Sequence, residues 1–174
     1  MSPSPPRVLL MAGSPSDLDL VLDCESVLSE LEIGSEIRVL SAHRTPDEAA
    51  ECARSAEKNG FDAIVTFAGL AAHLGGVAAA HSRLPVIQVP VRSGPLQGID
   101  AALASLQMPP GTPLAAVAIN GAKNAALLAA RMLSIGRPDL RDRMTRLGEI
   151  DRERYAPERI QEEIERRRRA RGGE

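Results

Sequence analysis

The sequence predicts an α/β fold, a three-layer sandwich in which helices cover both faces of a five-stranded parallel sheet. The main observation is that short runs of aliphatic and β-branched residues alternate with longer helical segments up to residue 135. Strands that each lead into a helix pair in parallel through right-handed crossovers. A closed eight-stranded barrel needs about 250 residues, whereas this chain has 174. The length therefore fits one open-sheet domain.

Each unit of the predicted sheet is a short strand followed by a helix. The aliphatic run at the start predicts a first strand, and the turn residues after it begin a helix at Asp17. The second helix also has a clear start, with Thr45 as N-cap and Pro46 at the first helical position. The predicted strands are 7–12, 36–40, 63–67, 85–89 and 114–119. The predicted helices are 17–31, 46–58, 71–81, 98–106 and 122–135. Five such units favour the strand order 2-1-3-4-5, the flavodoxin-like arrangement.

Residues 137–174 differ from residues 1–136, because nearly every second residue is charged. Leu140, Met144 and Leu147 form one thin apolar stripe at helical spacing, and a second stripe follows: Tyr155, Ile160 and Ile164. We expect a charged helical extension of the flavodoxin-like domain 1–136 that packs onto another surface. The four arginines 166–169 follow Glu162, Glu163 and Glu165. These acids neutralise much of the positive field, so the run predicts a solvated helix end and no nucleic-acid site.

Composition excludes several classes of function. Cys24 and Cys52 lie in helical patterns without metal-ligand or redox spacing, so we expect buried, unpaired thiols and no metal. The aromatic residues are two Phe, one Tyr and no Trp, which leaves no platform for stacking a flavin or bases. No apolar run approaches the ~20 residues of a membrane span. The first residues show no signal-peptide pattern, so we expect a cytoplasmic protein without membrane contact.

Ligands bind at the carboxyl edge of such a sheet, so the loops after the strands are the candidate site. The first loop contains Gly13, Ser14, Ser16 and Asp17 directly before a helix. Hydroxyl groups and free backbone N–H groups at a positive helix end favour an anion. Capping of the helix by Ser16 or Asp17 is the alternative interpretation of the same residues.

Two of the three histidines lie on this edge. The second loop reads Ser41, Ala42, His43 and Arg44, and capping does not explain its imidazole or its cation. The third loop contains the second histidine and small residues, namely Ala68, Gly69, Ala71, His73 and Leu74. Together the loops predict a pocket for an anionic small molecule. The fourth loop, 90–95, is a possible wall or lid, and Lys123 and Asn124 of the fifth loop are either substrate contacts or parts of a turn and helix cap.

Five motifs occur together, in order, across residues 7–136. They are Gly-Ser-x-Ser-Asp at 13–17, Ser-Ala-His-Arg-Thr-Pro at 41–46, Ala-Ala-His-Leu at 71–74, Gln-Met-Pro at 107–109 and Asn-Ala-Ala-Leu-Leu-Ala-Ala at 124–130. In this combination the chain resembles the N5-carboxyaminoimidazole ribonucleotide (N5-CAIR) mutases of de novo purine synthesis. It departs from the family pattern at Leu70, where glycine is usual, and at Gly75, where proline is usual.

The resemblance implies a cofactor-free reaction that moves a carboxylate from the exocyclic nitrogen of N5-CAIR to ring carbon C4, without ATP or metal. It implies that Ser14, Ser16, Asp17 and Arg44 hold the ribose and phosphate of a ribonucleotide. The residues that would line the rest of the site are Gly13, Ser41, Ala42, Ala68, Gly69, Ala71 and Leu74. It also implies a homo-octamer, and the small side chains of helices 71–81 and 122–135 would let subunits approach closely.

The reaction needs a proton donor at nitrogen and a base that removes the proton from C4. We expect His43 to serve as both, CO₂ to be held as an intermediate in the alanine-rich loop 68–74, and His73 to orient the carboxylate or the CO₂. The alternative within the family is aminoimidazole ribonucleotide (AIR) carboxylase, which takes CO₂ directly. That pattern resembles this one but has Lys after the second-loop histidine, where Arg44 stands, and Ser-Asn in the third loop, where Ala72-His73 stands.

An alternative of another class is a non-enzymatic flavodoxin-like binding module. An FMN carrier stacks its flavin on aromatic rings of its loops, and these loops have none. A phospho-receiver domain needs an aspartate at the end of its third strand, where Ala68 and Gly69 stand. The residues therefore speak against both forms of this alternative.

Overall fold

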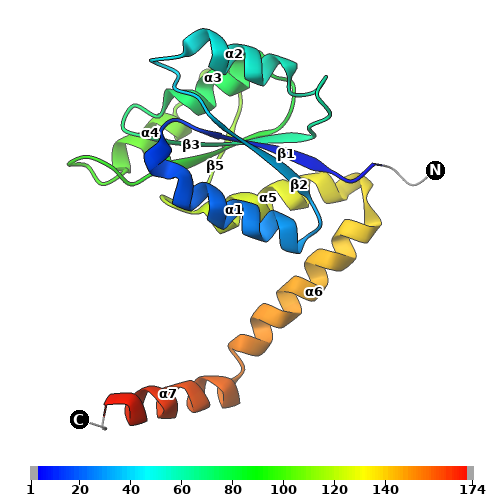
Figure 1. The fold of residues 1–174 in the computed structure, drawn as a ribbon, viewed down its shortest axis with the longest axis vertical. Coiled ribbons are helices and arrows are strands. Elements are labelled where there is room, and N and C mark those ends of the chain that lie inside the picture. Colours follow the sequence, from blue (N-terminus) through cyan, green and yellow to red (C-terminus); the bar gives the residue numbers. More distant parts are fainter. Residues whose placement is uncertain (1–3, 172–174) are drawn as a thin grey trace.

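The computed structural model describes residues 4–171, so the last three residues of the predicted extension lie outside the description. Five parallel strands form one sheet in the predicted order β2-β1-β3-β4-β5. The strands are β1 (Arg7–Ala12), β2 (Gly34–Val39), β3 (Ala63–Gly69), β4 (Val86–Val91) and β5 (Ala115–Ala116). The helices are α1 (Leu18–Glu30), α2 (Pro46–Ser55), α3 (His73–His81), α4 (Ile99–Leu106), α5 (Ala122–Leu133), α6 (Pro138–Arg154) and α7 (Pro157–Arg171). Figure 1 shows α1 and α5 on one side of the sheet and α2 and α3 on the other. The predicted three-layer sandwich is confirmed.

The elements differ from the prediction mainly at their ends. The fifth strand was expected over 114–119, but only Ala115–Ala116 pair as a strand. Beyond them the chain stays beside β4 through single bonds, such as the one from Asn120 N to Pro90 O of 2.9 Å. The third helix starts at His73, two residues later than predicted, because Leu70 and Ala72 adopt left-handed conformations with φ of 55° and 48°. A helix cannot pass through such residues.

Alternate side chains of the central strands build two cores, one on each face of the sheet. Val8, Leu10 and Phe67 point toward α1 and α5, whereas Leu9 and Ile64 point toward α2 and α3. The alanines of α5 that we associated with subunit contact are buried in the first core: Ala125, Ala126, Ala129 and Ala130. They let α5 lie close to α1 and the sheet within the same chain.

The two cysteines are free, as predicted. Cys24 is fully buried in the first core, and this burial raises the pKa of its thiol to about 12. Cys52 is only half-buried, so the prediction of a buried side chain holds for Cys24 and is wrong for Cys52.

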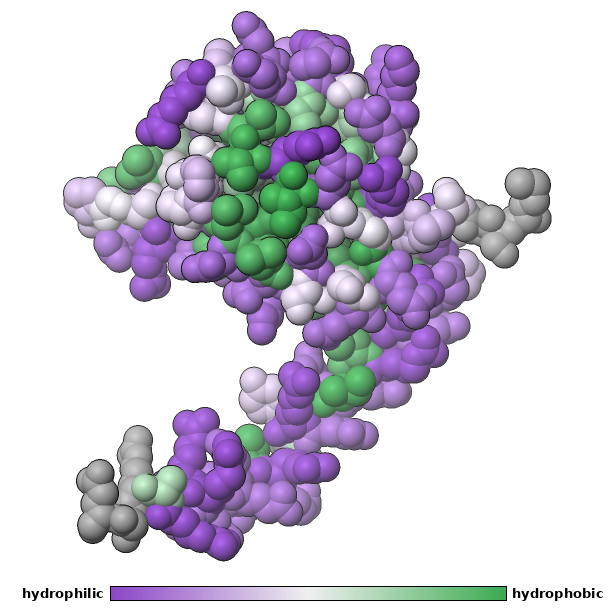
Figure 2. Space-filling view, in the orientation of Figure 1, coloured by the Kyte–Doolittle hydropathy of each residue, from purple (hydrophilic) through white to green (hydrophobic). Residues whose placement is uncertain are grey.

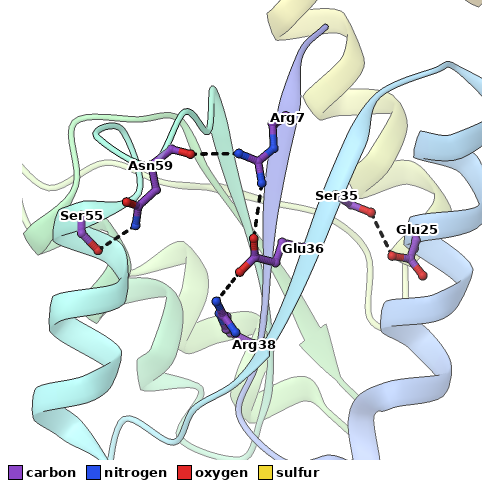
Figure 3. Close-up of polar contacts among 7 residues, drawn as sticks. All are labelled: Arg7, Glu25, Ser35, Glu36, Arg38, Ser55 and Asn59. Atoms are coloured by element: carbon purple, nitrogen blue, oxygen red, sulfur yellow. Dashed lines mark hydrogen bonds and ion pairs between the residues drawn. The ribbon is translucent and has the colours of Figure 1, made fainter.

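The edge strand β2 carries two charged side chains, Glu36 and Arg38, as Figure 3 shows. Glu36 pairs with Arg38 of the same strand and with Arg7 of β1, the latter at 3.3 Å. The Arg7 guanidinium also donates to Asn59 O at 2.9 Å and lies 4.4 Å from the centre of the Phe61 ring. Charges along an edge strand discourage pairing with a further strand. The charged side chains at this edge of the sheet therefore have a structural explanation.

The C-terminal extension begins as part of the domain and then leaves it. Leu140 of α6 is fully buried, and Met144 and Leu147 pack beside it on the first core, as the first apolar stripe predicts. The second stripe stays largely at the surface of the described residues, since Tyr155 is 78% exposed and Ile160 is 41% exposed. Figure 1 shows α6 running away from the sheet with α7 at its end, and Figure 2 shows that this part of the surface is mostly hydrophilic.

The arginine run on α7 is partly paired, as expected for a solvated helix. Glu163 accepts from Arg166 at 2.7 Å and from Arg167 at 2.6 Å, and Arg169 lies 3.5 Å from Glu165. These arginines lower the pKa of the Glu163 carboxyl to about 2. Across the described residues, no helix combines the length and the apolar character that crossing a membrane would need.

Candidate active site

The loops at the carboxyl edge of the sheet enclose a cleft of about 410 Å³. It is lined by all the residues that the sequence analysis placed in the first three loops of the site: Gly13, Ser14, Ser16, Asp17, Ser41, Ala42, His43, Arg44, Ala68, Gly69, Ala71, His73 and Leu74. These residues come from the carboxyl ends of β1, β2 and β3 and from the segments that follow them, which meet because Ala12 pairs with Val39 on one side and Phe67 on the other. Three residues that we did not select also line it, namely Leu70, Ala72 and Ser93.

The first loop forms a short 3₁₀ turn held by its own hydroxyl groups. Ser14 caps this turn, since its Oγ accepts from Ser16 N at 3.3 Å. Ser16 Oγ lies 2.8 Å from Ser14 Oγ and 3.0 Å from Asp17 Oδ1. Asp17 stands at the N-cap of α1 without a side-chain bond to the helix. Capping thus explains Ser14 but leaves the Asp17 carboxylate unexplained.

Asp17 is a nearly buried acid, with 7% of its surface exposed. Burial raises the pKa of its carboxyl above the ordinary 3.8, and hydrogen bonds from Ser16 and from the Ser14 backbone oppose this shift. A carboxylate accepts hydrogen bonds and is suited to hold hydroxyl groups. Its place in the cleft therefore fits a contact to a sugar.

The second loop is tied back on itself, which leaves the side chains of His43 and Arg44 at the cleft. Ser41 Oγ accepts from the backbone of His43 and of Arg44, at 3.4 and 3.3 Å. Thr45 Oγ1 accepts from Ser41 N at 2.9 Å instead of capping α2, so the predicted cap position is correct but its side-chain bond is absent. The imidazole of His43 and the guanidinium of Arg44 are exposed at the cleft.

The two predicted histidines are in direct contact across the cleft. His43 Nε2 lies 2.8 Å from His73 Nδ1, and the ring centres are 4.8 Å apart. A neutral imidazole has one N–H and one lone pair, so one ring donates to the other. Both rings cannot be cations while this bond exists, because both facing nitrogens would then carry a proton.

The third loop owes its shape to residues without large side chains. Gly13 N donates to Phe67 O at 2.8 Å, which joins the first loop to the end of β3. A Cβ at Gly69 would overlap Ser93 Oγ and would lie 3.0 Å from Val91 O, so only glycine fits there. Leu70, where the family pattern has glycine, takes the left-handed conformation despite its side chain and is 54% exposed. The departure at Leu70 thus keeps a backbone conformation that glycine adopts readily.

The fourth loop contributes one residue to the cleft, and the fifth contributes none. Ser93 lies at the cleft, and its loop is anchored by the bond of 2.8 Å from Arg92 N to Asn120 Oδ1. Lys123 and Asn124 do not line it, so the structure does not bring these two candidates to the site within this chain. In the sequence, the only sign that Ser93 lines the cleft is its position after the fourth strand. Among the residues described, no cluster of His, Cys, Asp and Glu has the arrangement of a metal site.

Comparisons with known proteins show the family of this chain. Residues 7–153 match the family model described as AIR carboxylase. The chain is 47% identical over 144 residues to an N5-carboxyaminoimidazole ribonucleotide mutase of Pyrococcus abyssi, covering 83% of each chain. It is 49% identical over 139 residues to the enzyme of the same name from Mycobacterium tuberculosis, covering 80% of each.

A solved structure shares the fold. The crystal structure of Treponema denticola PurE superposes with a TM-score of 0.76 at 30% identity, covering 86% of this chain and 94% of the other. The family match extends past the sheet domain into α6, further than the motifs at 7–136 reach. On the family model, the sequence relatives and the shared fold together, the chain belongs to the AIR carboxylase family.

Proposed function

We propose that this protein is an N5-CAIR mutase of de novo purine biosynthesis, an isomerase that converts N5-CAIR to 4-carboxy-5-aminoimidazole ribonucleotide (CAIR). One observation carries the proposal: the contacting imidazoles of His43 and His73 share a cleft with the hydroxyl-rich first loop and Arg44. A group that moves protons thus lies beside a group of residues suited to a phosphorylated sugar. The relatives named above are mutases, which argues against a non-enzymatic binding module.

The first and second loops bind the ribonucleotide in this proposal. Ser14 and Ser16 offer hydroxyl groups near a helix start, and Arg44 offers a cation for the phosphate. The nearly buried carboxylate of Asp17 accepts hydrogen bonds from the ribose. The remaining lining residues position the imidazole ring of the substrate by contact: Gly13, Ser41, Ala42, Ala68, Gly69, Ala71 and Leu74.

His43 moves a single proton in both directions. The bond between the exocyclic nitrogen and the carboxyl carbon breaks, CO₂ leaves, and His43 donates a proton to the nitrogen. C4 then attacks CO₂, the new carbon–carbon bond forms, and the C4 proton returns to His43. The contact with His73 suits this task because one ring donates and the other accepts, which holds the His43 imidazole in place. No external acid, base or cofactor is needed, since the proton count balances.

The third loop retains CO₂ between the two half-reactions. Ala68, Gly69, Ala71 and Leu74 give a small apolar wall beside the histidines. A neutral gas must be kept near C4 because its loss would leave AIR as the product. His73 orients the carboxylate or the CO₂ from the start of α3 while its Nδ1 contacts His43.

Self-association completes this proposal, with a cytoplasmic homo-octamer as the assembly. The apolar surface of α4 and its preceding loop supports it, because four side chains there are more than half exposed: Leu96, Ile99, Leu103 and Leu106. Such a patch on one chain fits a second copy of the same chain. Sedimentation equilibrium of the full chain tests the stoichiometry, and a monomer at micromolar concentration would contradict it.

The second candidate is an AIR carboxylase, which the description of the matching family model favours. The two activities share the cleft and differ in the substrate. The test supplies either N5-CAIR, or AIR with bicarbonate, in the absence of ATP. We expect a much larger kcat/KM for N5-CAIR, and a preference for AIR with bicarbonate would reverse the assignment.

A further inference from the structure

One buried hydroxyl beside the cleft lacks a hydrogen-bond partner. Among the described side chains, Ser93 Oγ is the only buried nitrogen or oxygen without one. The other serine hydroxyls of the cleft are bonded, Ser14 and Ser16 to each other and Ser41 to the backbone of its own loop. Buried polar groups in native proteins are rarely left without a partner. An exception in the wall of a substrate cleft points to a partner that arrives with the ligand.

The surrounding strands fix the place of this hydroxyl. Ser93 follows the end of β4, where Val91 pairs in register with Gly69 of β3. Its loop is held by the bond from Arg92 N to Asn120 Oδ1. The space that a side chain at Gly69 would fill is occupied by Ser93, whose Cβ would lie 3.2 Å from a Cβ there. The hydroxyl is therefore next to the small residues that form the apolar wall of the cleft.

We propose that Ser93 donates a hydrogen bond to the migrating carboxyl group and holds it as CO₂ between the two half-reactions. This inference rests on the proposed mutase function. The oxygens of a carboxylate and of CO₂ only accept hydrogen bonds, so they need a donor, and a serine hydroxyl is one. Rotation about the Cα–Cβ bond moves the hydroxyl between staggered positions without moving the backbone. Ser93 keeps its proton throughout, since the proton that is transferred belongs to His43.

The test follows the carboxyl carbon through the reaction. N5-CAIR labelled with ¹³C in its carboxyl group is supplied to the full-length chain in unlabelled bicarbonate buffer. CAIR and AIR are then quantified by chromatography and mass spectrometry, and the uncatalysed decarboxylation measured without enzyme is subtracted. The wild type should deliver the label to CAIR. Ser93→Ala should form AIR about tenfold faster relative to CAIR and should dilute the label in CAIR, because a donor to the carboxyl oxygens is lost.

Matched variants separate this role from a structural one. Ser93→Cys keeps the size of the side chain but is a weak donor, so it should lose CO₂ as Ser93→Ala does. Ser134→Ala removes a buried hydroxyl that lies outside the cleft and bonds to Arg131 O at 2.8 Å, so it should keep the wild-type product ratio. Urea unfolding should show Ser93→Ala to be at least as stable as the wild type, because the hydroxyl that it removes has no partner.

The possible results are distinct. Wild-type product ratios and label retention in both Ser93 variants would overturn the inference, as would a loss of stability with an unchanged ratio. A wild type that forms no CAIR from N5-CAIR would instead refute the proposed function, whatever the Ser93 variants do.

Discussion

Replacing Gly75 with alanine tests how α3, which carries His73, is held against the sheet. Gly75 lies two residues after His73 and packs on the side chain of Gln88 in β4. A Cβ at this position would overlap Gln88 Oε1 and would lie 3.1 Å from Thr66 Oγ1. A glutamine in solvent would swing aside, but Gln88 is fully buried and accepts a hydrogen bond of 2.6 Å from Thr66. Alanine therefore crowds the contact between α3 and the sheet and also breaks this bond.

The expected loss follows from three contributions. Overpacking of a tight core costs about 1–3 kcal/mol, and a buried polar group that loses its partner costs about 1–3 kcal/mol. The better helix propensity of alanine returns about 1 kcal/mol. Gly75→Ala should therefore lower the free energy of unfolding by about 3 kcal/mol. For a domain of this size, Tm should fall by about 6–12 °C.

Gly76→Ala is the matched control, because a Cβ there would meet Met108 Sδ at 3.6 Å, an ordinary contact. It should be stable or gain up to about 1 kcal/mol. The assay is urea unfolding followed by circular dichroism at fixed protein concentration. In Gly75→Ala/Gln88→Ala the obstructing side chain is gone, so the double variant should show a coupling energy of about 2 kcal/mol. Equal stability of the two glycine variants, or no coupling, would refute this reasoning.

Four further predictions concern the site and the thiols. His43→Asn should lower turnover roughly 10²–10⁴-fold, while substrate affinity measured by calorimetry stays within about tenfold of the wild type. His81→Asn, at the exposed end of α3, is the control and should change neither turnover nor affinity. Loss of substrate binding in His43→Asn would make His43 a structural residue. Asp17→Asn should raise KM with little change in kcat, as expected of a ribose contact, and an unchanged KM would contradict it. Because burial raises the Asp17 pKa above 3.8, ionisation of this carboxyl destabilises the folded state as pH rises through the raised pKa. In unfolding experiments Asp17→Asn should therefore be more stable than the wild type above pH 3.8 and equally stable below it. A stability difference that does not depend on pH would argue against this. A thiol reagent at neutral pH should modify Cys52 slowly and Cys24 only after unfolding, since the Cys24 pKa is about 12; rapid labelling of native Cys24 would contradict its burial.

The topology was predictable because hydrophobic period and strand–helix alternation are local signals. Parallel pairing then brings the loops after β1, β2 and β3 together, so the shared cleft of His43, His73 and Asp17 followed from the same pattern. The extent of β5 was not predictable, because its apolar run reads as a strand although only two residues pair. The start of α3 was missed because left-handed Leu70 and Ala72 carry side chains that usually avoid that conformation.

Two features of the site depend on contacts between distant residues, which a single sequence does not display. Gly75 stands where the family pattern has proline, and the buried side chain of Gln88 fills the space that a side chain at this position would occupy. Ser93 is one of many serines in the chain, and only its missing partner and its contact with Gly69 distinguish it. Spacing within the sequence identifies the loops, whereas packing between loops decides which of their residues reach the cleft.

The central claim is that the His43 imidazole exchanges a proton with the bound nucleotide. A crystal structure of the full chain with CAIR bound measures this most directly, through the distances from the His43 ring nitrogens to C4 and to the exocyclic nitrogen. The account predicts a ring nitrogen within about 3.5 Å of the reacting atoms, or joined to them by one ordered water. An imidazole turned away from the nucleotide, or separated from it by more than one water, would contradict the account.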